Sequence, residues 1–277
     1  MKKISRRSFL AAAAVSVAAL AMTACGGSAS SAASSVASSA ASSEAASSAA
    51  AELTTVETGK LTMATNATFP PYEMTTDSGE LEGIDVDTAK AIAEKLGLEL
   101  QIDDMDFDAA LLSVQQGKAD IVMAGVTVTD ERKAVMDFSD SYATGIQSII
   151  VPNDSDIASP DDLAGKKIGT QRGTTGYIYC SDDFGEDSVV AYDSGLTAVQ
   201  ALNNGQVDAV VIDNAPATEY VAANPGLKVL DTSYAEEDYA IGMAKGSALE
   251  DAVNKALEEL KADGTLQAIV DKYINAN

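Results

Sequence analysis

The chain of 277 residues contains no histidine. This absence excludes metal sites built from imidazole ligands, and it excludes the Ser-His-Asp and Cys-His arrangements of nucleophilic enzymes. The sequence also lacks a GxxxxGK[ST] phosphate-binding loop and a CxxC pair. We therefore expect neither a metal nor a cofactor, and any catalysis would have to use carboxylates, lysine, tyrosine or arginine.

Cysteine is scarce, and its two copies are Cys25 and Cys180. Residues 1–25 have the order of an export signal: basic residues, an apolar stretch over residues 9–22 that is too short for a stable membrane span, and small residues before Cys25. This order resembles a bacterial lipoprotein signal in which Cys25 becomes the lipidated first residue, and the alternative is plain signal cleavage nearby. Residues 5–10 also resemble a twin-arginine export motif, and either route leads outside the cytoplasm.

Basic residues are few, at 18 against 42 acidic residues. Four of the basic residues and none of the acidic ones lie in the signal, so its removal changes the net charge from −24 to −28. A surface of this sign repels nucleic acid and anionic membranes and mildly favours cationic ligands. We expect no nucleic-acid partner.

Large and apolar side chains are almost absent from residues 26–53, which are mostly serine and alanine. Such a segment cannot bury a core, and we expect a disordered tether that holds the folded part roughly 30 Å from its anchor. The folded part then begins near Thr54. Its length suits two lobes of about 100 residues better than a single core. With Cys25 lipidated, Cys180 has no disulfide partner, and its apolar neighbours predict a buried thiol.

Strand and helix patterns alternate along the rest of the chain. The apolar patterns predict strands at residues 61–65, 98–102, 121–124, 167–170, 189–192, 209–212 and 228–230, and helices at residues 86–96, 107–116, 197–203, 215–223, 249–260 and 266–274. This alternation predicts α/β layers with largely parallel sheets.

One unit occurs twice. Residues 110–125 align without gaps with residues 198–213, and each copy reads as a helix, a turn and a buried strand. Gly117 aligns with Gly205, and each glycine suits the left-handed position after a helix. The repeat favours two similar lobes, although two generic helix–strand units are the alternative. Ligands in open α/β sheets bind beyond the carboxyl ends of strands, where this repeat ends.

The segment 124–142 (AGVTVTDERKAVMDFSDSY) contains the clearest functional signal. An apolar run stops at Gly125, the hydroxyl of Thr127 follows, and a short helical pattern carries Arg132. Backbone N–H groups, a hydroxyl and a guanidinium at one place suit a carboxylate. Asp213 ends the matching strand of the repeat and suits an ammonium group, so together the two strand ends suit an α-amino acid. The alternatives are a helix cap with a surface salt bridge at Arg132 and an N-cap at Asp213.

These motifs carry a family resemblance. Further signposts are residues 67–73 (ATFPPYE), 83–87 (GIDVD), 105–108 (MDFD), 165–169 (GKKIG), 173–176 (GTTG), 209–213 (AVVID) and 260–265 (LKADGT). Over residues 60–273 the chain resembles the extracytoplasmic solute-binding proteins (family 3) of polar amino acid ABC transporters.

The resemblance implies a fold of two α/β lobes, the type II periplasmic-binding-protein-like fold, that closes on ligand like a hinged trap. The two hinge crossovers would lie near residues 143–147 and 235–239. Lobe 1 would comprise residues 54–143 and 240–277, and lobe 2 would comprise residues 144–239. Such a trap is expected to be a monomer.

The resemblance also implies roles for residues of the interlobe cleft. Arg132 and Thr127, helped by the Thr175 amide, would hold the α-carboxylate of the ligand. Asp213 and the Gly125 carbonyl would hold its α-ammonium group.

Four further residues would enclose the ligand side chain. Phe69 and Phe107 would sandwich it, although each could instead be a packing residue. Asn66 and Gln171 lie where the family often recognises the polar end of the side chain. Members that bind basic or amide side chains commonly have aspartate where this chain has Asn66. The neutral Asn66 side chain weakens the case for a strongly cationic ligand, so glutamine is slightly preferred, with arginine or cystine next.

The expected function is therefore capture of a polar L-amino acid outside the cell membrane and its delivery to an ABC permease, without catalysis. One alternative is an enzyme that resembles periplasmic cyclohexadienyl (prephenate or arogenate) dehydratases, which need a general acid beside the leaving hydroxyl. The other is a ligand sensor for a membrane receptor. An ammonium-binding Asp213 favours transport over the dehydration of prephenate, which has no ammonium group.

Overall fold

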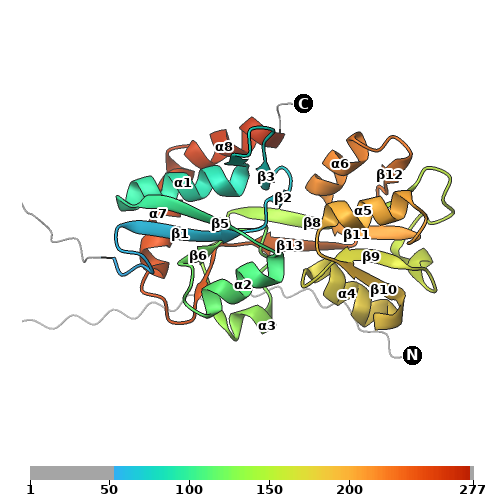
Figure 1. Ribbon diagram of the computed structural model, residues 1–277, viewed down its shortest axis with the longest axis horizontal. Helices are drawn as coiled ribbons and strands as arrows, with labels where there is room; N and C mark the ends of the chain where they lie inside the picture. The colour runs from blue at the N-terminus through green and yellow to red at the C-terminus, as the bar shows by residue number, and fades with distance from the viewer. Residues whose placement is uncertain (1–52, 275–277) are drawn as a thin grey trace, which may run out of the picture. The chain divides into compact units, whose positions relative to one another are not determined.

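The computed structural model describes residues 53–274 (Figure 1). The predicted signal, Cys25 and all but the last residue of the predicted tether lie outside the described residues. Within the described range, no helix has both the length and the hydropathy needed to cross a membrane.

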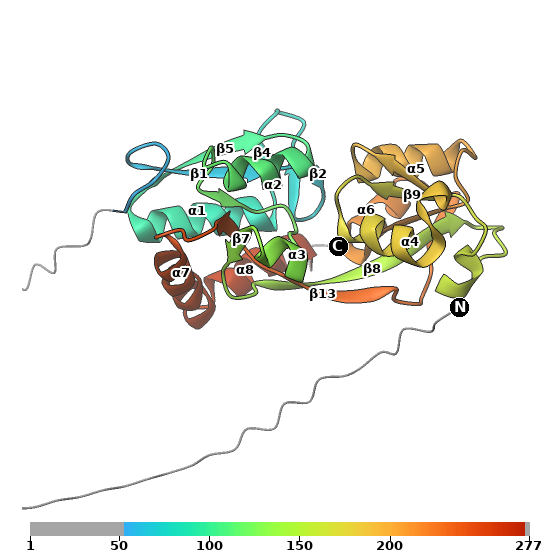
Figure 2. The same ribbon diagram turned by 90° about the horizontal axis from the view of Figure 1, so that it is seen from below.

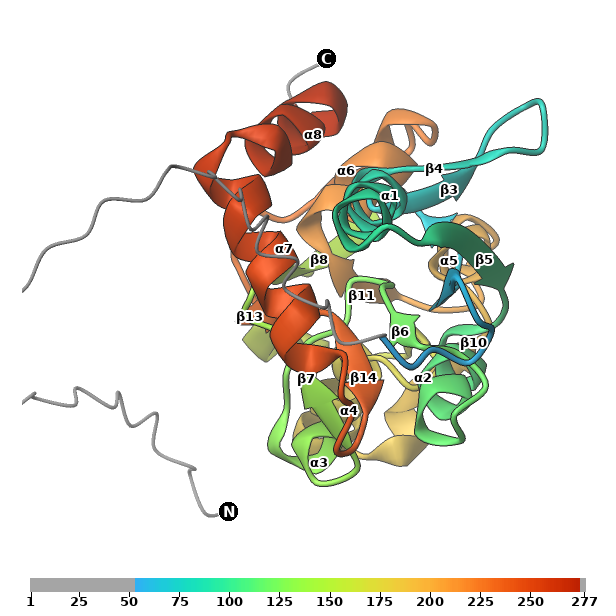
Figure 3. The same cartoon turned by 90° about the vertical axis from the view of Figure 1, so that its left-hand side faces the viewer.

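The first lobe is built on a five-stranded sheet in the order β5-β1-β6-β14-β7. Its strands are β1 (Lys60–Thr65), β5 (Glu99–Asp104), β6 (Ile121–Val122), β7 (Met136–Phe138) and β14 (Gly242–Ala244). Its helices are α1 (Ile84–Leu96), α2 (Phe107–Gln115), α3 (Asp130–Lys133), α7 (Glu250–Ala262) and α8 (Thr265–Ile274). α7 and α8 lie beside α1, so the end of the chain completes the lobe in which the described chain begins (Figure 3).

The second lobe is built on a six-stranded sheet in the order β10-β9-β11-β8-β12, with β13 also paired to β8. Its strands are β8 (Ala143–Pro152), β9 (Ile168–Gln171), β10 (Val189–Tyr192), β11 (Ala209–Asp213), β12 (Leu227–Val229) and β13 (Ala235–Tyr239). Its helices are α4 (Thr175–Phe184), α5 (Gly195–Asn203) and α6 (Asn214–Ala222), with short 3₁₀ turns at Pro160–Leu163 and Glu186–Ser188. A small third sheet of β2 (Thr68–Phe69), β3 (Glu73–Thr75) and β4 (Leu81–Glu82) belongs to the first lobe.

Two strands connect the lobes. β8 and β13 run side by side between the two sheets (Figures 1 and 2). They pair antiparallel from Ala143 opposite Tyr239 to Gln147 opposite Ala235. These are the residues at which the family resemblance placed the crossovers.

The predicted repeat is present in the hydrogen bonds of both lobes. After α2, the amide of Lys118 donates to the Ser113 carbonyl, and after α5 the amide of Gln206 donates to the Ala201 carbonyl, both at 2.9 Å. The glycines that precede these amides, Gly117 and Gly205, have φ values of 65° and 67°, so both take the left-handed conformation predicted for them. The strands that follow, β6 and β11, each pair in parallel with the first parallel strand of their own sheet, β1 and β9.

The prediction of largely parallel sheets is wrong. β1 pairs in parallel with β5 and β6, and β9 with β10 and β11, but the strands that carry the chain between the lobes pair antiparallel. The physical reason is that β8 and β13 run in opposite directions between the lobes, and β14 then enters the first sheet against its parallel strands. The predictions also missed α4, β7 and β14, and they included only the first half of β8, as a crossover.

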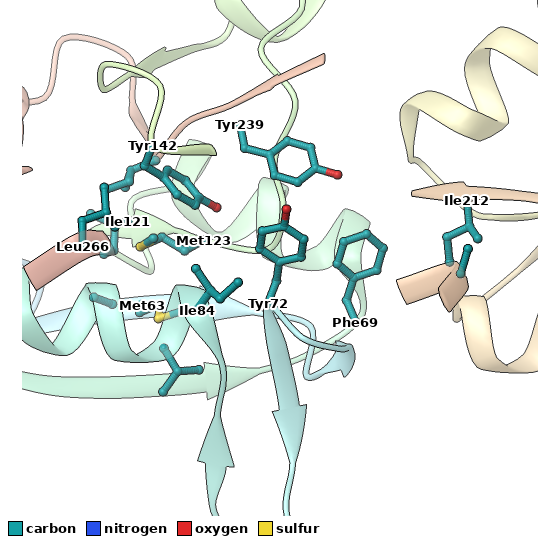
Figure 4. Packing of buried hydrophobic residues seen from close by; sticks show 14 of the residues in the cluster. Met63, Phe69, Tyr72, Ile84, Ile121, Met123, Tyr142, Ile212, Tyr239 and Leu266 are labelled. Carbon is teal, nitrogen blue, oxygen red and sulfur yellow. The ribbon is translucent and has the colours of Figure 1, made fainter. Parts of the chain in front are cut away.

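The largest core cluster continues from the first sheet to the crossover strands. Met63, Ile84 and Met123 fill its interior beneath Tyr72 and Tyr239 (Figure 4). The Tyr72 ring meets the Tyr239 ring edge-on with centroids 5.3 Å apart. Because Tyr239 ends β13, this aromatic contact fastens the crossover strand to the first lobe.

Cys180 on α4 is a free and fully buried thiol, as predicted. Burial raises its pKa to about 12, so the thiol stays protonated and packs as a small apolar side chain.

Gly83 precedes α1 with a φ of 137°, and a Cβ at this position would overlap the Tyr72 carbonyl oxygen. We predict that Gly83→Ala lowers the free energy of unfolding by at least about 3 kcal/mol, because backbone strain and backbone overlap add. The matched control is Gly97→Ala at the other end of α1, where φ is 70° and no atom lies within 4 Å of the added Cβ. Gly97→Ala should cost only about 1 kcal/mol in urea denaturation, and equal losses for the two variants would contradict the prediction.

Candidate functional site

All nine predicted ligand-binding residues line one cavity between the two lobes. The first lobe and the segment after β6 supply Asn66, Phe69, Phe107, Gly125, Thr127 and Arg132, and the second lobe supplies Gln171, Thr175 and Asp213. Glu73, Ala124 and Thr174 complete the lining.

The Arg132 guanidinium links the two lobes. Arg132 is buried on α3, whose N-cap Thr129 accepts a hydrogen bond from the Arg132 amide. Its Nη1 donates to the Thr127 carbonyl at 2.7 Å, and its Nη2 donates to the Gly173 carbonyl of the second lobe at 3.1 Å. The guanidinium carbon also lies 5.4 Å from the centroid of the Phe107 ring, which is a cation–π contact.

Burial lowers the pKa of Arg132 from its usual value, while the Glu237 charge acts in the opposite direction. An arginine remains ionised even so, because its usual pKa lies far above neutrality. The cavity therefore contains a desolvated positive charge held in a fixed position. Such a charge binds a carboxylate more strongly than a solvated one does.

The start of α4 faces the same end of the cavity. Thr174 caps the helix by accepting from the Tyr177 amide, and both Thr174 and Thr175 line the cavity. The Thr175 hydroxyl lies 3.4 Å from the Thr127 hydroxyl across the interlobe boundary. Because the N-terminus of a ten-residue helix carries partial positive charge, it adds to the Arg132 field at this end.

Asp213 lies at the carboxyl end of β11 and is 7% exposed. Its Oδ2 accepts a 2.6 Å hydrogen bond from Gln147 Nε2, and its Oδ1 accepts one from the Tyr239 hydroxyl. The side chain does not cap α6, although the residue occupies the N-cap position. The alternative role as a capping side chain is therefore not seen.

The environment of Asp213 favours its neutral form. Burial is the main cause of a pKa raised to about 7, and the nearby Glu237 charge adds to it, whereas the hydrogen bonds from Tyr239 and Gln147 oppose it. A cationic group beside Asp213 would stabilise the ionised form.

Gly125 follows β6 with a φ of 55° and donates its N–H to Asp85 Oδ2 at 2.9 Å. A Cβ at this position would lie 2.9 Å from the Phe69 ring. Both the left-handed backbone and the close ring require glycine at this point of the cavity wall.

The two predicted aromatic residues differ in their surroundings. Phe69 lies on β2, and its ring packs against Tyr72 at a centroid distance of 5.9 Å (Figure 4). Phe107 is the first residue of α2 and belongs to a core cluster with Ala110 and Val114, while it also lines the cavity. Phe107 therefore packs in the core and also lines the cavity, and its contact with a ligand side chain stays a prediction.

Asn66 and Gln171 meet across the lobes. Gln171 Nε2 donates to Asn66 Oδ1 at 2.9 Å, and Asn66 Nδ2 donates to the Met105 carbonyl at 2.8 Å. Nearby, the Tyr220 hydroxyl of α6 donates to the Thr68 carbonyl. These contacts join the lobes at the end of the cavity that the two amides line.

Sequence reasoning missed several buried polar residues of the site. Glu73 lines the cavity from β3, and burial followed by the Asp85 charge raises its pKa well above the usual range. Gln147 and Glu237 lie on the crossover strands next to Asp213 and Thr127. The only signal was their place in segments already quoted for the resemblance, because an isolated acid or amide does not reveal which way its side chain points.

These features define an extracellular solute-binding protein. The chain belongs to the bacterial extracellular solute-binding proteins, family 3, whose model matches residues 61–276.

Individual relatives agree with this family and with the two-lobed α/β fold. The L-cystine-binding protein TcyJ of Escherichia coli (strain K12) is 34% identical over 225 residues, which cover 80% of this chain and 85% of the relative. The chain is also similar to two solved structures of an ancestral arginine-binding protein. The glutamine-bound form is 43% identical with a TM-score of 0.73, the arginine-bound form is 44% identical with a TM-score of 0.74, and each match covers 78% of this chain and 98% of the other.

The raised pKa of Asp213 predicts a pH dependence of stability in the ligand-free protein. Between about pH 4 and about pH 7 the folded protein retains a proton that an unfolded aspartate has released, so unfolding becomes easier as the pH rises, by about 1.4 kcal/mol per pH unit. Asp213→Asn should remove this contribution. Denaturant unfolding at several pH values across this range measures it as the difference between the two proteins.

The pKa values of Glu73 and Asp85 are also raised, but both residues are present in wild type and in Asp213→Asn. Their contributions therefore cancel when the two pH slopes are subtracted. Asp238→Asn, at an exposed position of β13, is the control and should leave the slope unchanged. The same slope in wild type and Asp213→Asn would show that Asp213 is ionised throughout this range.

Proposed function

We propose that the protein captures a polar L-amino acid between its lobes outside the cytoplasm and delivers it to an ABC permease. The observation that supports this most is that one cavity contains both a fixed guanidinium at Arg132 and a buried carboxyl at Asp213 whose pKa is raised. The α-carboxylate would bind Arg132, Thr127 and the Thr175 amide. The α-ammonium group would bind Asp213 and the Gly125 carbonyl, and Phe69 and Phe107 would flank the side chain.

The polar end of the cavity bears on the ligand class. Asn66 and Gln171 are neutral amides that both donate and accept hydrogen bonds, which suits the side-chain amide of glutamine. A protonated Glu73 could donate to the same amide, whereas an ionised Glu73 would instead favour a guanidinium. We therefore keep glutamine as the first candidate, followed by arginine and cystine, and the names of the relatives include all three.

We propose binding without catalysis. The relatives are solute-binding proteins rather than enzymes, and an acidic residue in the ammonium position has no partner in prephenate. We further propose a monomer that is anchored by a lipid on Cys25 and tethered by residues 26–53. Its first lobe would comprise residues 54–143 and 240–277, and its second lobe residues 144–239.

A thermal-shift panel of the common L-amino acids, with cystine, tests the function. The signal-free chain is first unfolded and refolded to remove carried-over ligand. A ligand at about a thousand times its dissociation constant adds roughly 4 kcal/mol, which corresponds to a shift of about 10 °C for a chain of this size. A shift with one or a few amino acids supports the proposal. No shift with any of them contradicts it, and prephenate is then tested next.

Arg132→Ala should weaken binding of the amino acid found in the panel by roughly 2–5 kcal/mol, because the carboxylate loses its charged partner in a desolvated site. Isothermal titration calorimetry measures the loss. The matched control is Arg172→Ala, which removes an arginine of the second lobe that is half exposed beside Asp193. A loss of less than about tenfold for Arg132→Ala, or an equal loss for the control, would refute the assignment of the carboxylate to Arg132.

A further inference from the structure

Glu237 is a buried carboxylate directly behind the cavity. It lies on crossover strand β13, is 6% exposed and is not part of the cavity lining. Its Oε2 accepts a 2.9 Å hydrogen bond from Gln147 Nε2 and a 3.2 Å hydrogen bond from the Thr127 hydroxyl. None of the ion pairs among the described residues involves Glu237.

The Thr127 hydroxyl is held in place beside Glu237. The backbone on either side of Thr127 is tied to β13 and the residue after it, since the Val128 amide donates to the Asp238 carbonyl at 3.0 Å and the Ala240 amide donates to the Val126 carbonyl at 3.1 Å. Backbone pairing therefore holds the segments that carry Thr127 and Glu237 side by side.

The hydroxyl has a single proton to donate. Its two neighbours are the Glu237 carboxylate at 3.2 Å and the Thr175 hydroxyl at 3.4 Å. A charged acceptor at the shorter distance is the stronger partner, so the Thr127 hydroxyl donates its hydrogen bond to Glu237. A ligand carboxylate at Arg132 needs the same proton if Thr127 is to bind it.

We propose that Glu237 sets the affinity of the site by competing with the ligand carboxylate for the Thr127 hydroxyl proton, without touching the ligand. This inference rests on the proposed function. The ligand then exchanges one hydrogen-bond acceptor for another at Thr127, so this contact adds little to its binding free energy. Glu237 is thus a positioning residue that holds affinity down in a protein that must also release its ligand.

The charge of Glu237 acts in the same direction. The Arg132 guanidinium donates to the carbonyls of Thr127 and Gly173, and it interacts with Glu237 only through the longer-range field. A ligand carboxylate beside Thr127 would place a second negative charge near Glu237 in a desolvated region, where like charges repel strongly. A glutamine at position 237 would remove the negative charge, and its carbonyl oxygen would leave only a weaker, neutral acceptor for the Thr127 hydroxyl.

The test is a double-mutant cycle of Glu237→Gln and Thr127→Val, with Glu236→Gln as the matched control. Glu236 is the exposed neighbour on the same strand, so its replacement makes the same change in charge away from the site. In the first part, urea denaturation of the ligand-free proteins measures whether the two substitutions are additive. We expect non-additivity, because Glu237→Gln weakens the hydrogen bond that Thr127→Val removes. Strict additivity would overturn the proposal whether or not a ligand is known.

In the second part, L-glutamine, L-arginine and L-cystine are titrated into the same proteins by calorimetry. Glu237→Gln should bind the amino acid that wild type binds roughly fivefold more tightly, because a charged competitor for the Thr127 proton becomes a neutral one and the repulsion of the ligand carboxylate is removed. The gain should be smaller in the Thr127→Val background, where only the loss of repulsion remains, and Glu236→Gln should behave as wild type. Unchanged or weaker binding by Glu237→Gln would overturn the proposal, and weaker binding would identify Glu237 as part of the ammonium site instead.

The two proposals fail in different ways. If wild type binds none of the three amino acids, the result counts against the proposed ligands, while the ligand-free cycle still decides whether Thr127 and Glu237 are coupled. If wild type binds and Glu237→Gln does not tighten binding, the proposed function stands and the role of Glu237 is refuted.

Discussion

The antiparallel pairing of β8 with β13 is the constraint on which the site depends. It connects the lobes, and it brings Gln147 and Glu237, one from each strand, into contact beside Asp213. The packing there is tight, because a Cβ on Gly145 would overlap the Tyr239 ring and the Asp213 carboxylate. The two strands that connect the lobes therefore also position the polar groups beside the cavity.

The balance of charge in this region has a clear physical consequence. Arg132 is a buried cation, whereas Glu73, Asp85, Asp213 and Glu237 are all buried acids. Burial raises the pKa of three of these acids, which means that their ionised forms lack sufficient compensation in the ligand-free protein. In the proposed complex, an ammonium group beside Asp213 would supply positive charge and favour the ionised form of this acid. Without a cation, protonation lowers the cost of burying the acids.

The sequence predicted those parts of the protein that depend on local chemistry. The repeat, the glycines at Gly117 and Gly205, and the strand ends at Gly125 and Asp213 follow from apolar periodicity and backbone conformation. The direction of β14 and the orientation of Glu237 depend instead on how distant strands pair, which no local pattern encodes. Family resemblance filled part of this gap by placing the crossovers, but it supplied no contact for Gln147, Glu237 or Glu73.

Each end of the cavity contains a hydrogen bond between two polar side chains of the protein. At one end Gln171 donates to Asn66, and at the other the Thr127 hydroxyl donates to Glu237. Buried polar groups without partners are costly, so the Gln171–Asn66 pair stabilises the contact between the lobes. A ligand that binds there must replace each internal partner with one of equal quality. A ligand that replaces the internal hydrogen bond at only one end leaves a buried donor or acceptor unsatisfied at the other end. Selectivity would therefore depend on replacing the hydrogen bonds at both ends more than on the volume of the cavity.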